Sequence, residues 1–195
     1  MALRALARDL GCLFRREGIG GTVRKASGAF ARTELLVLVK PLDAIAPIAF
    51  APRLELSELR QASLPHLAEL NRRRCDTRAT HRFADDLARG YAGFVARDDG
   101  HTAGYYWWTD RGHRHLERLD VTLAAGDVYG FDFFLAQEHR GDGRAVEFLY
   151  AVESALRDRG FTRLWGYVRA DNRPARWLYS SRGYEVVKSV HLRAP

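Results

Sequence analysis

Two closely spaced glycines mark the most chemically informative part of the chain, the segment 140–145 (Arg-Gly-Asp-Gly-Arg-Ala). It follows the largely apolar run 128–134 and precedes a helical pattern. Gly141 and Gly143 permit tight turns and allow a ligand to approach the backbone closely. The first amides of the following helix have no partner within the helix and favour anions, and the flanking arginines add positive charge. The junction therefore predicts a phosphate-binding loop.

The loop by itself does not identify the ligand. No Gly-Lys-Ser/Thr follows it, as a P-loop requires, and the third glycine of the dinucleotide fingerprint is missing. A strand-to-helix turn with two glycines can also be purely structural. A second segment, 172–184, supplies the missing context: Asn-Arg-Pro-Ala-Arg-Trp-Leu-Tyr-Ser-Ser-Arg-Gly-Tyr.

Together the patterns R-x-x-G-x-A and N-x-x-A-x-x-x-Y, followed by Gly-Tyr, resemble the GNAT superfamily (GCN5-related N-acetyltransferases). The resemblance is clear over 128–187 and weaker, though in register, over 53–127. It implies an α/β (α+β) fold with a mixed, mostly antiparallel central sheet flanked by helices. It also implies an N-acyltransferase that uses acetyl-CoA as cosubstrate and acylates a primary amine. We expect the protein to be bacterial and, with only two cysteines, cytoplasmic.

The resemblance also implies roles for individual residues. The strand backbone at Leu135 holds pantetheine and the thioester carbonyl, and Asn172 and Ala175 belong to the next part of the CoA site. Tyr179 is the general acid that protonates the departing thiolate. The pyrophosphate loop consists of Arg140, Gly141, Asp142, Gly143, Arg144 and Ala145, the last replacing the commoner glycine.

The chemistry fits these residues. A tyrosine with an ordinary pKa of about 10 is protonated at neutral pH and can donate to a thiolate. Asp132 lies in mid-strand between phenylalanines, where an acid needs a partner or an open cleft. It is the first candidate for the general base or for an amine-binding group, and Glu138 is the second. The alternatives are that Tyr179 only packs, that Asn172 only caps its helix, and that water deprotonates the amine.

Composition limits the class of protein. With 195 residues and 47% hydrophobic residues, the chain predicts a globular protein. The resemblance implies a GNAT-like domain over 51–195 and leaves 1–50 as an N-terminal helix-strand extension. The net charge of +7 suits anionic partners. Basic residues are mixed with acidic ones and no nucleic-acid motif is present, so we expect no nucleic-acid partner. The two cysteines form neither a disulfide framework nor a zinc motif, and we expect no metal. No segment is long enough to span a membrane.

Periodicity and turn signals place these residues on elements. Residues 105–108 (Tyr-Tyr-Trp-Trp) are either core residues or an aromatic wall of a substrate pocket. Residues 110–118, with His113 and His115, are interpreted as a solvated basic loop, with metal binding the weaker alternative. We predict helices over 3–17, from 63, over 81–89, over 144–159 and over 172–181, and the first of these either packs on the domain or lies on a membrane. The predicted strands span 34–40, 54–59, 91–97, 101–109, 128–136, 161–168 and 184–192.

The sequence leaves several questions open. A catalytically inactive domain of the same fold, binding CoA or a protein partner, is the alternative to an enzyme. The acceptor amine, the acyl length and the formation of a homodimer are also open, because acceptor contacts come from variable elements.

Overall fold

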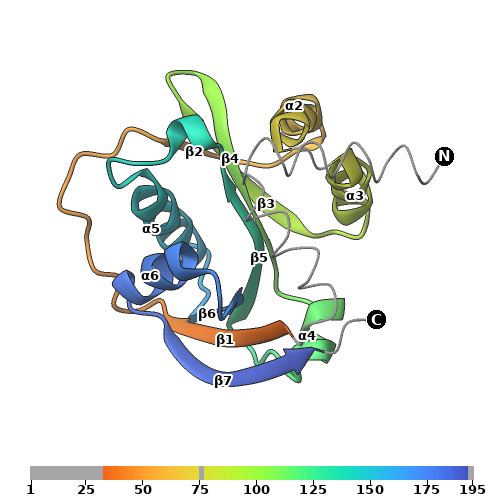
Figure 1. Ribbon diagram of the computed structural model, residues 1–195, viewed down its shortest axis with the longest axis vertical. Coiled ribbons are helices and arrows are strands. Elements are labelled where there is room, and N and C mark those ends of the chain that lie inside the picture. The colour runs from red at the N-terminus through yellow and green to blue at the C-terminus, as the bar shows by residue number, and fades with distance from the viewer. Residues whose placement is uncertain (1–32, 75–76, 193–195) are drawn as a thin grey trace.

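The computed structural model describes residues 33–74 and 77–192 (Figure 1). The predicted helix over 3–17, the first part of the predicted extension and both cysteines lie outside the described residues.

Within the described residues, seven strands form one sheet in the order β2-β3-β4-β5-β6-β1-β7. β5 and β6 pair in parallel, and all other neighbours are antiparallel. This arrangement confirms the predicted mixed, mostly antiparallel sheet. The strands are β1 (Thr33–Pro41), β2 (Glu55–Glu58), β3 (Ala92–Asp98), β4 (His101–Thr109), β5 (Asp127–Leu135), β6 (Arg163–Arg169) and β7 (Glu185–Leu192).

Helices cover both faces of the sheet (Figure 1). α5 and α6 pack on one face, where Leu149, Val152 and Leu178 belong to the first of two apolar cores. α2, α3 and α4 lie on the other face, where Leu67 and Phe83 belong to the second core. The helices are α2 (Leu64–Arg74), α3 (Thr77–Ala88), α4 (Arg114–Leu119), α5 (Arg144–Arg157) and α6 (Arg173–Ser181), and the short 3-10 helices span Gln61–Ser63 and Gln137–His139.

The aromatic run in β4 contributes to both cores, because neighbouring strand residues point to opposite faces. Tyr105 and Trp107 pack in the core beneath α2 and α3. Tyr106 is buried in the core beneath α5 and α6, and Trp108 packs against it. Three of these four side chains are buried, so the run serves mainly as core.

The prediction of a solvated loop over 110–118 is wrong. Residues 114–119 form α4, and its N-cap His113 is buried, with Nδ1 accepting a hydrogen bond from the His115 amide at 3.1 Å. Leu116 and Leu119 anchor the helix in the second core. This short segment carries too few apolar residues for a clear helical period, so its helix depends on tertiary burial.

β1 lies inside the sheet, between β6 and β7. It confirms the strand predicted over 34–40, and its apolar side chains face both cores, as in Leu35 and Leu38. After β1 the chain runs through residues 42–54, which we call the strap. The strap passes along the outer side of α6 and α5 before it reaches β2 (Figure 1). The described part of the predicted extension, from Thr33 onward, therefore contributes a strand to the same sheet as the rest of the domain.

β5 and β6 separate part-way along the sheet. Their pairing covers Asp127 to Tyr129 on β5, whereas β5 continues to Leu135 and β6 continues alongside β1 to Arg169. On its other edge β5 contains an extra residue, since Tyr105 pairs with Phe134 but Trp107 pairs with Phe131. Asp132 lies in this bulge with a left-handed φ of 51°. Beyond Tyr129, β5 and β6 no longer pair with each other, and we call this separation the β5–β6 gap.

Candidate functional site

The glycine loop adopts an unusual backbone. Gly141, Asp142 and Gly143 have successive φ values of 110°, 45° and 77°, in the left-handed region that favours glycine. Gly143 is the N-cap of α5 and supplies no side-chain cap. The Arg144 amide donates to the Gly141 carbonyl at 2.9 Å, so an anion at this turn would meet the amides that follow it, where the positive end of the helix dipole favours one. This geometry is suited to a diphosphate.

The two arginines of the loop are held by the protein itself. Arg144 Nη1 donates to Asp98 Oδ1 at 3.1 Å, and Arg140 Nε donates to the Leu135 carbonyl at 2.9 Å. His139, which is half-buried, contacts Asp98 Oδ2 at 3.0 Å. Burial opposes the charged form of Asp98, but the bonds from His139 and Arg144 hold the pKa of its carboxyl below the usual value. The arginines thus brace the loop while keeping positive charge near it.

α6 begins as predicted. The Asn172 side chain accepts a hydrogen bond from the Ala175 amide at 3.3 Å, and Pro174 occupies the first turn. Seven residues after Asn172, Tyr179 is half-buried, with its ring packed edge-to-face on Tyr184 at 4.9 Å between centroids. Burial raises the pKa of Tyr179, and the nearby Tyr167 and Glu153 act in the same direction. Tyr179 therefore stays protonated across the neutral range, as a proton donor must.

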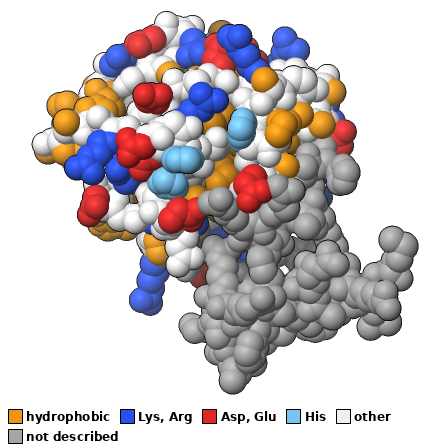
Figure 2. Space-filling model, turned by 90° about the horizontal axis from the view of Figure 1, so that it is seen from above, with side chains coloured by type: hydrophobic (Ala, Val, Ile, Leu, Met, Phe, Trp, Pro, Cys, Tyr) orange, Lys and Arg blue, Asp and Glu red, His pale blue; other side chains and the backbone are white. Residues whose placement is uncertain are grey.

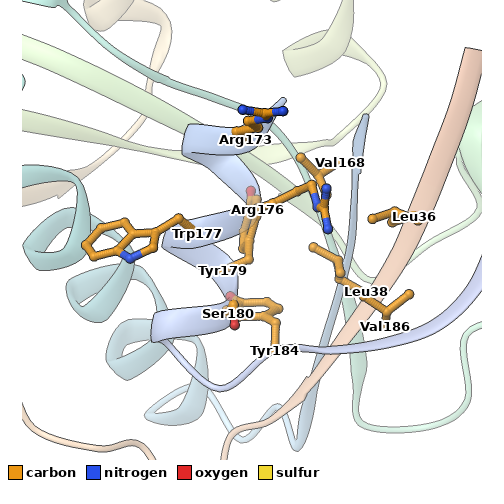
Figure 3. A pocket seen from close by; sticks show the side chains of 10 residues that line it. All are labelled: Leu36, Leu38, Val168, Arg173, Arg176, Trp177, Tyr179, Ser180, Tyr184 and Val186. Carbon is orange, nitrogen blue, oxygen red and sulfur yellow. The ribbon is translucent and has the colours of Figure 1, made fainter. Parts of the chain in front are cut away.

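A cavity of about 470 Å³ separates α6 from the strands. Arg176, Tyr179 and Tyr184 extend into this space, whereas Trp177 projects to the opposite side of the helix (Figure 3). Its lining residues are Leu36, Leu38, Val168, Arg173, Arg176, Trp177, Tyr179, Ser180, Tyr184 and Val186. Tyr179 thus lies at the wall of an accessible, largely apolar space.

Asp132 lies toward the opposite helices. Its carboxylate accepts a charged hydrogen bond from Arg82 of α3, and Arg82 also lies 3.8 Å from Asp86. Asp132 thus has the partner that a mid-strand acid needs. Tyr167, across the β5–β6 gap, has its pKa raised by burial and by the Asp132 charge. The second candidate, Glu138, is exposed in the 3-10 helix after β5.

Two histidines at the start of α4, the N-cap His113 and His115, pack against the aromatic side chains of neighbouring strands. His115 packs edge-to-face on Tyr167 at 5.6 Å, and its Nδ1 lies 3.3 Å from the Tyr129 hydroxyl. Burial lowers the pKa of His113 to about 4, and the charges of His115 and Arg114 act in the same direction. Burial likewise lowers the pKa of His115 to about 4, together with the charge of Arg114. Both rings are therefore neutral at pH 7. No group of three or more His, Cys, Asp or Glu in the described part of the chain is arranged to hold a metal ion.

A buried ionic cluster was not predicted. Glu153 of α5 pairs with Lys40 of β1 at 2.9 Å and with Arg182 at 2.5 Å, and all three side chains are almost fully buried. Burial lowers the pKa of Lys40 against the opposing effect of Glu153. The signal available in the sequence was an acid beside Val152, on the apolar stripe of a helix. The cluster connects β1, α5 and the end of α6, and so positions Tyr179.

The predicted residues fall on two sides of the sheet. The loop 140–145 and the α6 residues lie on the side of α5 and α6, whereas Asp132 pairs with α3 on the other side. The β5–β6 gap lies between the two groups. Figure 2 shows acidic and basic side chains intermingled over one face, so the net charge of +7 forms no single basic patch there. None of the helices within the described residues is long and apolar enough to cross a bilayer.

Comparison with solved structures supports the same fold at low sequence identity. A protein assigned to GNAT-family acetyltransferases, from Novosphingobium aromaticivorans, has TM-score 0.55 and 18% identity over 82% of this chain and 62% of its own. A Staphylococcus epidermidis protein of unknown function has TM-score 0.64 and 9% identity over 87% of this chain and 64% of its own. This chain thus spans less than two thirds of both proteins.

A third structure is the ribosomal-protein-S18-alanine N-acetyltransferase of Escherichia coli, with TM-score 0.52 and 20% identity over 67% of this chain and 76% of that enzyme. A search among curated proteins finds no match. The model of the Acetyltransferase (GNAT) family matches residues 54–184. Because this match covers well over half of the chain, the protein belongs to the GNAT family of acetyltransferases.

Proposed function

We propose that the protein is an N-acyltransferase that transfers an acetyl group from acetyl-CoA directly to a primary amine. The β5–β6 gap carries this proposal, because it lies between the glycine loop on one side of the sheet and Asp132 on the other. A cosubstrate on the first side and an amine on the second can meet there. An aminoglycoside N-acetyltransferase of the same fold, solved in complex with CoA, has TM-score 0.52 and 16% identity over 69% of this chain.

In this proposal the backbone of the glycine loop holds the pyrophosphate of CoA. The backbone of β5 near Leu135, along the β5–β6 gap, and the start of α6, at Asn172 and Ala175, hold the pantetheine arm. Arg140 belongs to this loop and also fixes the turn out of β5, because its Nε donates to the Leu135 carbonyl. Preorganised backbone donors bind an anion without the cost of ordering long side chains.

The chemical step needs no covalent enzyme intermediate. The amine nitrogen attacks the thioester carbonyl, the C–N bond forms and the C–S bond breaks. An amine that binds as the cation first loses one proton to water and so becomes nucleophilic. Tyr179 gives its hydroxyl proton to the departing thiolate, the acylated nitrogen loses its second proton to water, and water returns a proton to Tyr179. The products are an amide and free CoA. Positioning of the two substrates and proton donation each lower the barrier.

Asp132 is proposed to bind the amine rather than to remove its proton. Its carboxylate already accepts a hydrogen bond from the Arg82 guanidinium, so it lies where a cationic group is bound. A cationic amine can share or replace the Arg82 contact and so be held at the edge of the β5–β6 gap.

The test is thiol release from acetyl-CoA in the presence of a panel of amines, together with the shift in melting temperature on adding CoA. We expect both stabilisation by CoA and amine-dependent thiol release. Stabilisation without release for any amine, even at high protein concentration, would favour the inactive CoA-binding alternative. The absence of any CoA effect would reject both.

A further inference from the structure

Phe50 of the strap lies directly on the proposed phosphate loop. A Cβ atom added to Gly143 would lie 2.8 Å from Phe50 Cζ and 3.0 Å from Cε1. The ring therefore meets Gly143 with its tip, so the contact does not use its flat faces. Phe50 is 40% exposed, one of the few large apolar side chains of the described residues with this much exposure.

The strap holds Phe50 in this position from both directions. Before it, the Ala46 carbonyl accepts a hydrogen bond from Arg182 Nη1 at 3.0 Å. After it, the buried Glu147 carboxylate of α5 accepts hydrogen bonds from the consecutive amides of Arg53 and Leu54. An aromatic ring held this way loses little freedom when a ligand covers it.

The position of the ring relative to the loop selects which part of CoA it meets. Pantetheine must run from the pyrophosphate inward to the β5–β6 gap. Adenosine leaves the pyrophosphate in the other direction, and the strap passes along the outer side of α5 and α6 (Figure 1). An exposed aromatic face beside a bound diphosphate is a stacking surface for a nucleobase.

We infer that Phe50 stacks on the adenine of CoA, so that the strap forms the outer wall of the nucleotide site. This inference rests on the proposed function. It also gives the strap between β1 and β2 a role beyond connecting two strands, because it brings a binding residue to a loop that lies about ninety positions later in the chain.

The experiment measures the dissociation constants of CoA and 4′-phosphopantetheine, which lacks adenosine, by calorimetry. We compare the full-length protein with Phe50→Ala, Phe50→Leu and Phe50→Trp. Leucine keeps apolar bulk against Gly143 but has no aromatic face, and tryptophan keeps the face. Val187→Ala, at an exposed site on β7, is the matched control, and thermal unfolding verifies that each variant is folded.

Phe50→Ala and Phe50→Leu should each lower the affinity for CoA about tenfold, as expected for loss of a base–aromatic stack. The affinity for 4′-phosphopantetheine should not change, and Phe50→Trp should retain CoA affinity. Equal losses for both ligands would overturn the inference, because Phe50 would then only shape the loop. Tighter CoA binding by Phe50→Ala would also overturn it, because the ring would then obstruct the site. If the unaltered protein binds CoA and all variants bind it equally, only this inference fails; if the unaltered protein does not bind CoA, the proposed function fails first.

Discussion

Replacing Gly143 with alanine separates backbone strain from obstruction of the loop. The residue has φ 77°, which a side chain tolerates poorly, and its new Cβ would lie 2.8 Å from the Phe50 ring. Gly160, at the other end of α5, is the matched control. It has a similar φ of 87°, but nothing lies within 4 Å of its added Cβ.

The cost of the left-handed conformation is shared by the two variants, at about 1–2 kcal/mol each. In a chain of this size, 1 kcal/mol lowers the melting temperature by about 2–4 °C. Both variants should therefore melt about 2–8 °C lower than the unaltered protein. The melting temperature of Gly143→Ala should fall somewhat more than that of Gly160→Ala, because its Cβ must also push the Phe50 ring aside.

The two variants should differ sharply in CoA binding. Gly143→Ala places a methyl group beside the amides proposed to hold the pyrophosphate and displaces Phe50, so CoA affinity should fall by about tenfold or more. Gly160→Ala should bind CoA normally. Calorimetric titration with CoA, on protein first verified as folded, gives both constants. Equal CoA affinities for the two variants would remove the glycine loop from the site and refute the reasoning.

Three further predictions follow from the site and its supports. Tyr179→Phe should lower kcat about 100-fold or more while leaving the CoA dissociation constant unchanged; loss of CoA binding in a folded variant would make Tyr179 a binding residue instead. His113 has its pKa lowered from 6.5 to about 4, so the unfolded chain binds the proton first and stability falls as pH drops from 6.5 toward 4. This linkage amounts to about 2 kcal/mol between pH 7 and pH 5. His113→Asn, which keeps an acceptor for the His115 amide, should remove that part of the pH dependence in urea unfolding, and an unaltered slope would contradict it. Glu153→Gln leaves Lys40 and Arg182 buried without a counter-charge and should cost about 3–5 kcal/mol of unfolding free energy; a loss of less than about 1 kcal/mol would show that the cluster is not tightly coupled.

Local signals in the sequence were sufficient for much of the fold. Pro174 and Asn172 fixed the start of α6, and Gly160, with its φ of 87°, marked the end of α5. The turn at Asp99 and Gly100 defined the hairpin of β3 and β4. These features depend on near neighbours along the chain, which is why a sequence pattern detects them.

The pairing of segments far apart in the chain could not be predicted from the sequence. Nothing in the run 34–40 indicates that β1 inserts between β6 and β7, because any apolar strand presents the same pattern. The short helix α4 was missed for a related reason, since Leu116 and Leu119 need a distant core to bury them. Likewise, the pairing of Asp132 with Arg82 joins residues 50 positions apart.

The sequence by itself determined the glycine turn at 141–143 and the start of α6, because a tight turn and a helix cap depend on consecutive residues. The tertiary structure decided how these parts combine. It separated β5 from β6, placed Asp132 on the far side from the loop, and laid Phe50 of the strap on Gly143. Those contacts join segments far apart in the chain, and they depend on which surfaces bury one another rather than on any local pattern.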